Sequence, residues 1–233
     1  MACLDHLVIV APDLAQGVSW CEQTLGVTPG PGGAHPLMGT HNRLIRIDSP
    51  AFTDAYLEII AIDPMAMPQR QAPLKRWFDM DDAAFMQDVR TRGPRLAHWV
   101  ARVDDLTHSL SAWSALGIDR GRQLAAQRDT PQGLLSWQIS VRDDGQRLMA
   151  GCLPTLIQWG ARHPAHDMPR SALSLKSVQL QHPQAGTLKQ ALSDAGLKPN
   201  MQPDSPLNVQ AGSAHLSAVL QTPRGEVILS SLL

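Results

Sequence analysis

The sequence has few cysteines, and they are arranged in no recognisable motif. Cys3, Cys21 and Cys152 are the three cysteines among 233 residues; they are widely separated and include no C-x-x-C spacing. This pattern argues against a disulfide framework and against a cysteine-based zinc site, and it favours a reducing compartment.

The sequence also has no excess of charge and no long apolar run. Twenty Lys and Arg residues face 21 Asp and Glu residues, for a net charge of -1, which argues against binding nucleic acid by phosphate neutralisation. No stretch approaches the roughly 18 consecutive apolar residues of a membrane span, and the N-terminus lacks the basic region of a signal peptide. We therefore expect a cytoplasmic globular protein with neither a nucleic-acid partner nor a membrane partner.

What the sequence does contain is a repeat. The segment LDHLVIVAPDL, from Leu4, aligns with LAHWVARVDDL, from Leu96, and a third copy, LKSVQLQHPQAGTL, starts at Leu175. Each copy has the pattern of a short alternating strand, a turn and a helix of about three turns that ends at a glycine, where a left-handed residue closes a helix. The three glycines are Gly26, Gly117 and Gly196.

Further strands follow each helix. Alternation predicts strands at 42–48 and 56–62, at 134–141 and 153–159, and at 214–221 and 226–231, with one more expected among 28–41, 120–128 and 200–210. Each unit is thus βαβββ, which predicts an α+β fold with an antiparallel-rich sheet and helices on one face.

The repeat also predicts the domain organisation. We expect βαβββ modules at 1–62 and 94–160 that share one cavity, and a degenerate third unit at 171–233. Residues 63–93 belong to no copy, and we interpret them as a packed connector with a helix at about 82–90 or as a lid over a site.

Two histidines and a glutamate occupy matching places in the first two copies. His6 and His98 lie on the first strands, while Glu58 and Gln158 lie in the last strands, and alternation turns all four toward the concave side of the sheet. A buried carboxylate such as Glu58 needs a cation, a strong donor or a proton.

The third copy keeps neither residue type, because Ser177 replaces the histidine and Leu229 falls at the place of the glutamate. The His and Glu residues are therefore not a requirement of the βαβββ unit, which favours a site made by the first two copies. Two imidazoles and one carboxylate can hold Zn, Ni, Mn or Fe(II) while leaving open positions.

The chain resembles the glyoxalase-like branch of the vicinal oxygen chelate superfamily over nearly its whole length. The resemblance rests on LDHLVIVAPDL, YLEII, RWFDMDD, AHWVARVDDL and LPTLIQWGARHP. It implies paired modules that curl into an incomplete barrel around a metal-centred cavity. The implied ligands are His6, Glu58 and His98, with Gln158 in a fourth place where many metal-dependent glyoxalases have a glutamate.

The resemblance implies a divalent-metal-dependent enzyme of lyase or isomerase type, acting on a small molecule that chelates through adjacent oxygens. Glu58 is then both a ligand and the candidate base. Alternation places Arg46 and Gln138 on concave faces, where Arg46 could bind an anionic group, although a surface salt bridge is an equal alternative. The single tyrosine, Tyr56, two residues from Glu58, is compatible with a ring-cleaving dioxygenase.

Several alternatives stay open at this point. The protein could be a metal-free binding protein of the resistance type, or His6 and His98 could be hydrogen-bonded core histidines. In the second connector, at 160–170, we expect His163 and His166 to be solvated or to cap a turn. A small-molecule substrate or ligand is the expected partner, with homodimer formation left open.

Overall fold

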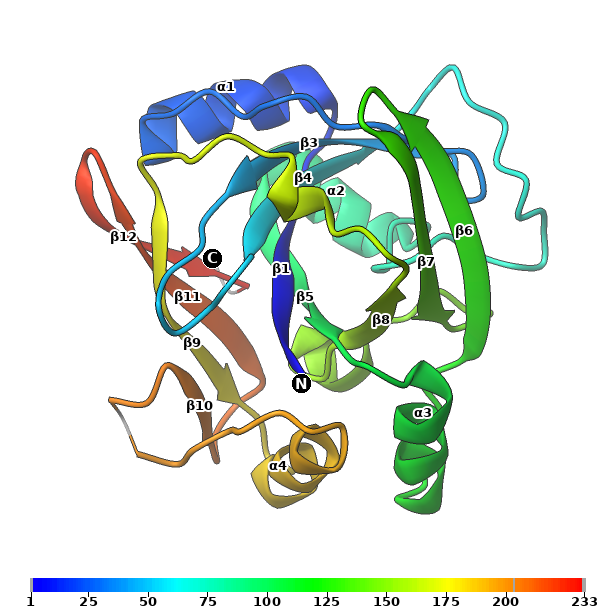
Figure 1. Ribbon diagram of the computed structural model, residues 1–233, viewed down its shortest axis with the longest axis vertical. Coiled ribbons are helices and arrows are strands. Elements are labelled where there is room, and N and C mark those ends of the chain that lie inside the picture. The colour runs from blue at the N-terminus through cyan, green and yellow to red at the C-terminus, as the bar shows by residue number, and fades with distance from the viewer. Residues whose placement is uncertain (1, 203, 232–233) are drawn as a thin grey trace.

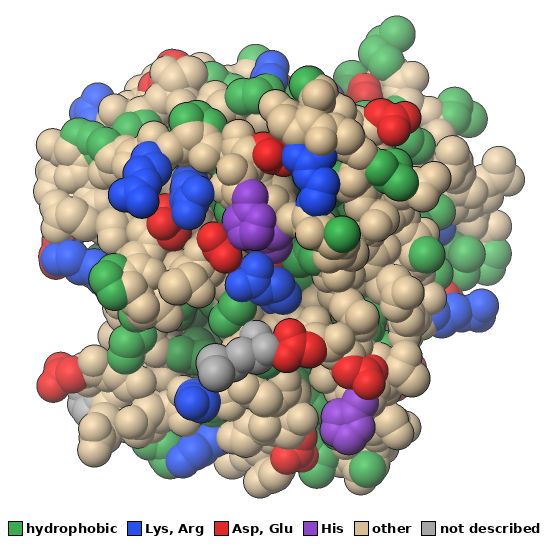
Figure 2. Space-filling model, viewed as in Figure 1, with side chains coloured by type: hydrophobic (Ala, Val, Ile, Leu, Met, Phe, Trp, Pro, Cys, Tyr) green, Lys and Arg blue, Asp and Glu red, His purple; other side chains and the backbone are tan. Residues whose placement is uncertain are grey.

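The computed structural model describes residues 2–202 and 204–231. It has the predicted α+β class: an eight-stranded sheet curls into a half-barrel, and a second sheet of four strands packs beside it (Figure 1). Basic and acidic side chains are interspersed over the face shown in Figure 2, in keeping with the net charge of -1. None of the helices in the described residues is long and apolar enough to cross a membrane.

The half-barrel is built from two βαβββ units with the same pairing. In each unit the first strand pairs in parallel with the last, and β1 and β5 join the units antiparallel, so the strand order is β2-β3-β4-β1-β5-β8-β7-β6. The first unit comprises β1 (Cys3–Val10), α1 (Leu14–Leu25), β2 (Ala34–His35), β3 (Thr40–Arg46) and β4 (Tyr56–Ile62). The second comprises β5 (Arg95–Arg102), α3 (Leu106–Ala115), β6 (Arg122–Thr130), β7 (Gly133–Val141) and β8 (Thr155–Trp159).

The second sheet repeats the order of elements but not the pairing of strands. It contains β9 (Ser174–Gln181), α4 (Ala185–Asp194), β10 (Leu207–Gln210), β11 (His215–Thr222) and β12 (Gly225–Ser230). Its strand order is β10-β9-β11-β12, so its first strand pairs with the second and third strands instead of with the last. Two short 3-10 helices, η1 (Leu148–Gly151) and η2 (Pro164–His166), precede and follow β8 in the chain.

The helix ends follow the sequence signals. Asp13 caps α1 by accepting a hydrogen bond from the backbone N–H of Gln16, as Ser, Thr, Asp and Asn do at helix starts. The three predicted closing glycines all adopt left-handed backbone conformations, with φ of 75° at Gly26, 74° at Gly117 and 85° at Gly196.

The curled sheet is apolar on both faces. Leu7, Ile9 and other residues of the convex face pack with α1, α3, α4 and the second sheet. Val8 and Ile139, on the concave face, belong to a separate cluster inside the half-barrel. The connector, which includes α2 (Ala83–Arg92), contributes Trp77, Phe78 and Met80 to this inner cluster, and all three are buried.

Candidate functional site

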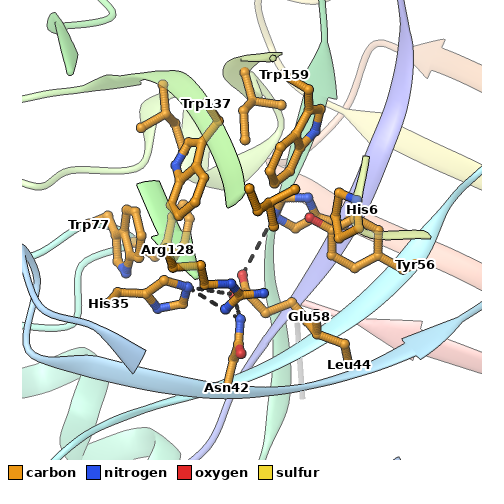
Figure 3. Close-up of a pocket in the computed structure, with 15 residues that line it drawn as sticks. His6, His35, Asn42, Leu44, Tyr56, Glu58, Trp77, Arg128, Trp137 and Trp159 are labelled. Atoms are coloured by element: carbon orange, nitrogen blue, oxygen red, sulfur yellow. Dashed lines mark hydrogen bonds and ion pairs between the residues drawn. The ribbon is translucent and has the colours of Figure 1, made fainter. Parts of the chain in front are cut away.

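A cavity of about 40 Å³ lies inside the curled sheet, large enough for a few ordered waters or the reacting end of a small molecule. Strands of both modules and the connector line it (Figure 3). The lining residues are His6, His35, Asn42, Leu44, Tyr56, Glu58, Trp77, Phe78, Arg128, Leu135, Trp137, Ile139, Ile157, Trp159 and Pro164.

His6 and Glu58 meet inside this cavity, each only 5% exposed. β1 and β4 are parallel neighbours, and their register places Glu58 beside Val8, so both polar side chains leave the same face of the sheet. His6 Nε2 lies 3.5 Å from Glu58 Oε2, while the side-chain amide of Asn42 donates to Glu58 Oε1 at 2.6 Å. His35 Nε2 lies 3.9 Å from the same oxygen, so both carboxylate oxygens face polar partners (Figure 3).

Asp5 fixes the orientation of the His6 ring. Simple alternation would place Asp5 on the opposite face from His6, but a register shift in β1 between Leu4 and His6 interrupts the alternation there. The Asp5 carboxylate accepts hydrogen bonds from His6 Nδ1 at 2.6 Å, from Trp159 Nε1 at 2.9 Å and from His163 Nε2 at 2.9 Å. With Nδ1 bound to Asp5, His6 presents Nε2 to Glu58 and to the cavity.

The electrostatics of this cluster favour a charged pair. Burial alone would lower the pKa of His6, but the hydrogen bonds to Asp5 and Glu58 outweigh it and raise this pKa to about 9. Burial likewise opposes the charge on Glu58, but His6, His35 and Asn42 lower its pKa to about 2. Burial lowers the pKa of His35 to about 4, so His35 is neutral at pH 7. Burial raises the pKa of Tyr56, whose ring stacks on His6 at 4.5 Å, well above its usual value.

His98 lies outside this cluster, in a separate buried environment. Its Nε2 accepts a hydrogen bond from the Thr155 backbone N–H at 3.0 Å and lies 3.4 Å from Arg120 Nη2. The ring of Phe78 lies 5.2 Å from the His98 ring, and Phe78 lines the cavity whereas His98 does not. Burial, followed by the charge of Arg120, lowers the pKa of His98 well below its usual value.

The counterpart of Glu58 in the second module is Thr155. Glu58 pairs with Val8 across the parallel strands of the first module, and Thr155 pairs with Val100 in the second. Val8 and Val100 are aligned in the repeat, so the His98–Thr155 contact corresponds to the His6–Glu58 contact.

The expected orientation of two glutamines is reversed in the structure. Gln158 Oε1 accepts a hydrogen bond from the Leu106 N–H at the start of α3, 2.8 Å away, and Gln138 is exposed and bonded to Gln123. Their apolar neighbours Trp137 and Ile157 line the cavity instead. The prediction assumed that apolar side chains mark the helix side, whereas the interior of the half-barrel is itself an apolar core.

The predicted metal ligands are therefore not brought together. His6 and Glu58 are adjacent, but His98 Nε2 and Gln158 Oε1 accept backbone N–H groups elsewhere. In the part of the chain that the structure describes, no group of three or more His, Cys, Asp or Glu side chains could hold one metal ion. The residues in this arrangement do not fit a divalent ion.

The Arg46 guanidinium binds neighbouring groups of the protein, which agrees with the salt-bridge alternative and not with a free anion-binding group. Its guanidinium donates to Asp48 at 2.8 Å and to the Ala165 carbonyl at 2.8 Å, and lies 3.6 Å from Asp54. It lines an outer groove of about 840 Å³, whose other lining residues are 27, 28, 30–34, 36, 44, 45, 127–132, 135, 164 and 167–172. Leu44, Leu135, Pro164 and Arg128 line both this groove and the inner cavity, so the groove adjoins the cavity that holds His6 and Glu58.

Sequence reasoning missed several residues of the site. Asn42 had a signal, because the alternation that placed Arg46 on the concave side places Asn42 there too. His35 lies in a strand of two residues, too short for a periodic pattern. His163 caps η2, as expected, by accepting the Ala165 N–H, but it is buried and also reaches Asp5 across 158 positions of the chain.

Comparison with known proteins identifies the family. A family model described as a glyoxalase-like domain matches residues 4–196. The chain belongs to this family, which confirms the resemblance found in the sequence. No curated protein matches the chain in sequence.

Solved structures are similar to this chain at low sequence identity. A hypothetical protein from Staphylococcus aureus is 14% identical, with 99% of this chain and 85% of that chain covered and a TM-score of 0.58. Methylmalonyl-CoA epimerase from Mycobacterium tuberculosis is 15% identical, covering 67% of this chain and 86% of that one, with a TM-score of 0.37. The Streptomyces coelicolor methylmalonyl-CoA epimerase, in complex with 2-nitronate-propionyl-CoA, is 17% identical over 68% of this chain and 98% of that one, with a TM-score of 0.40.

Proposed function

We propose that this protein is an enzyme of isomerase or lyase type that moves a proton on a carbon atom next to the carbonyl group of a small molecule. The observation that carries the proposal is the His6–Glu58 pair, a proton donor and a carboxylate 3.5 Å apart inside a cavity that adjoins an outer groove. Such a pair supplies both groups that enolisation requires.

In this proposal His6 polarises the substrate. Its Nδ1 is held by Asp5 at 2.6 Å, so Nε2–H is the group directed at an incoming carbonyl oxygen. A positive imidazolium stabilises the negative charge that develops on that oxygen as the neighbouring C–H proton leaves. The stacked Tyr56 ring supports the imidazole from one side.

Glu58 accepts the proton in this scheme. While it is paired with His6 its pKa is about 2, which makes it a weak base. When the substrate oxygen takes over the Nε2–H donor, Glu58 loses its strongest stabilising partner and its proton affinity rises. Asn42, 2.6 Å away, still holds the other carboxylate oxygen and keeps the base in place.

Binding without turnover is the second candidate, and the aromatic walls of the cavity favour it. Trp77, Trp137 and Trp159 line the cavity, and the rings of Trp137 and Trp159 lie 5.5 Å apart. Indole faces give a flat ligand a large contact area, which is sufficient for sequestration.

Exchange of carbon-bound protons in D₂O distinguishes the two candidates. Aldehydes, ketones and oxo acids are incubated with the protein, and loss of the proton signal next to the carbonyl is followed by NMR. We expect the wild type to exchange the carbon-bound proton of at least one compound. Glu58→Gln should exchange it about 100-fold or more slowly. Glu226→Gln is the control, because it makes the same change at an exposed residue of β12. This variant should exchange the proton at the rate of the wild type.

Equal exchange by Glu58→Gln and the wild type would show that Glu58 is not the base. Saturable binding of a compound with no exchange in any variant would favour the binding protein.

A further inference from the structure

We propose that the substrate of this site carries a carboxylate group, bound by Arg128, and an apolar tail that lies in the outer groove. This proposal rests on the proposed function, because it names the class of molecule on which His6 and Glu58 act. The predicted substrate is thus a carbonyl acid whose small reacting end enters the inner cavity.

Arg128 lies where the inner cavity adjoins the groove, and it has no ion-pair partner among the described residues. It lies on β6, and among the described residues no carboxylate lies within ion-pairing distance of its guanidinium. Its Nη1 atom is buried and has no hydrogen-bond partner in the described part of the chain. A buried guanidinium nitrogen without an acceptor is costly, and an incoming anion would relieve that cost.

The surroundings hold Arg128 at this position. The run GPGG at residues 30–33 passes beside it, and a Cβ atom on Gly33 would collide with Nη1. The Gly33 N–H donates to Asn42 Oδ1 at 2.8 Å, which ties the same run to the partner of Glu58. Arg128 extends toward His35, Asn42 and Glu58 in Figure 3, so a bound carboxylate would lie next to the proposed base.

The inner cavity and the outer groove differ in size, which fits a substrate with a small head and a larger tail. The inner cavity, about 40 Å³, accepts only a small group, whereas the outer groove, about 840 Å³, holds a drug-sized molecule. Pro31, Leu44, Leu135 and Pro169 give the groove apolar walls. Because Arg128 lines both volumes, its guanidinium can bind the acid while the head and tail point in opposite directions.

Isothermal titration calorimetry with matched probes tests the proposal. The probes are pyruvate, 2-oxohexanoate and the methyl ester of each, which carry the same carbonyl group with and without a charge and with and without a tail. We expect 2-oxohexanoate to bind the wild type about tenfold or more tighter than its ester, and tighter than pyruvate. Arg128→Gln should remove the preference for the acid.

Arg43→Gln is the matched control, because Arg43 is exposed on β3 and lines none of the volumes described above. It should keep the full preference for the acid. Glu58→Gln should also keep it, although proton exchange is lost.

Three results would overturn the proposal: an unchanged acid preference in Arg128→Gln, equal binding of acid and ester by the wild type, or no saturable binding of either acid. If the wild type binds the acids through Arg128 but exchanges no proton, the substrate class stands and the proposed reaction fails.

Discussion

The Nε2 atom of His163 lies 2.9 Å from Oδ2 of Asp5, and the other oxygen of that carboxylate binds His6 Nδ1 at 2.6 Å. His163 Nδ1 accepts the Ala165 N–H, so Nε2 carries the proton that is donated to Asp5. His163, in the loop after the second module, thus supports through Asp5 the His6 side chain of the first module, which is the proposed electrophile.

Loss of this support should destabilise the protein. We expect His163→Phe to lower the free energy of unfolding by about 1–3 kcal/mol, because Asp5, a fully buried carboxylate, loses one of its hydrogen-bond donors. Urea denaturation measures the effect. His166→Phe, at a side chain that is 62% exposed, should change it by less than about 0.5 kcal/mol. Equal effects of the two substitutions would contradict the support role of His163.

The raised pKa of His6 predicts a loss of stability at alkaline pH. Its pKa is about 9 in the folded protein against an ordinary 6.5, so the folded state binds more protons than the unfolded state between these values. The stabilisation is fully present below pH 6.5 and is lost as the pH rises through about 9. The difference is on the order of 3 kcal/mol.

Urea denaturation between pH 6 and pH 9.5 checks this prediction. The free energy of unfolding should fall across this range in the wild type and fall less in His6→Gln, whose side chain does not titrate. Parallel curves for the two proteins would show that His6 has an ordinary pKa.

Metal binding should not depend on His98 or Gln158. His98 Nε2 and Gln158 Oε1 accept backbone N–H groups, and neither residue lines the cavity that holds His6 and Glu58. We expect His98→Asn and Gln158→Ala to leave the affinity for Zn²⁺, Ni²⁺ or Mn²⁺ unchanged, and His6→Asn to reduce any affinity present. Calorimetric titration measures all three variants. A joint loss in His6→Asn and His98→Asn would support the ligand set expected from the family.

Phe78 should act as a core residue and not as part of an open lid. Its side chain is 3% exposed, between the rings of Trp77 and His98. Phe78→Ala should lower the free energy of unfolding by about 3–5 kcal/mol, because it leaves a cavity in the half-barrel. Met67→Ala, in the same connector at a side chain that is 88% exposed, is the control and should change stability little. A change of less than about 1 kcal/mol in Phe78→Ala would favour the lid.

The sequence by itself determined the features that depend on local periodicity. The closing glycines Gly26, Gly117 and Gly196 are where the repeat predicted them, because a left-handed residue after a helix is a local requirement. His6 and Glu58 share a face because side chains alternate along a strand, and β1 pairs with β4 in unbroken register from His6 to Val10.

Tertiary structure alone decided the rest of the site. Both faces of the half-barrel are apolar, so alternation in β7 and β8 could not say which face Gln138 and Gln158 would take. The shifted register in β1 brought Asp5 to His6, and no periodic pattern encodes such a shift. Arg128 and His163 reach the site through contacts between segments far apart in the chain. Such contacts depend on how the sheet curls and on what packs inside it, and neither is a property of any single stretch of sequence.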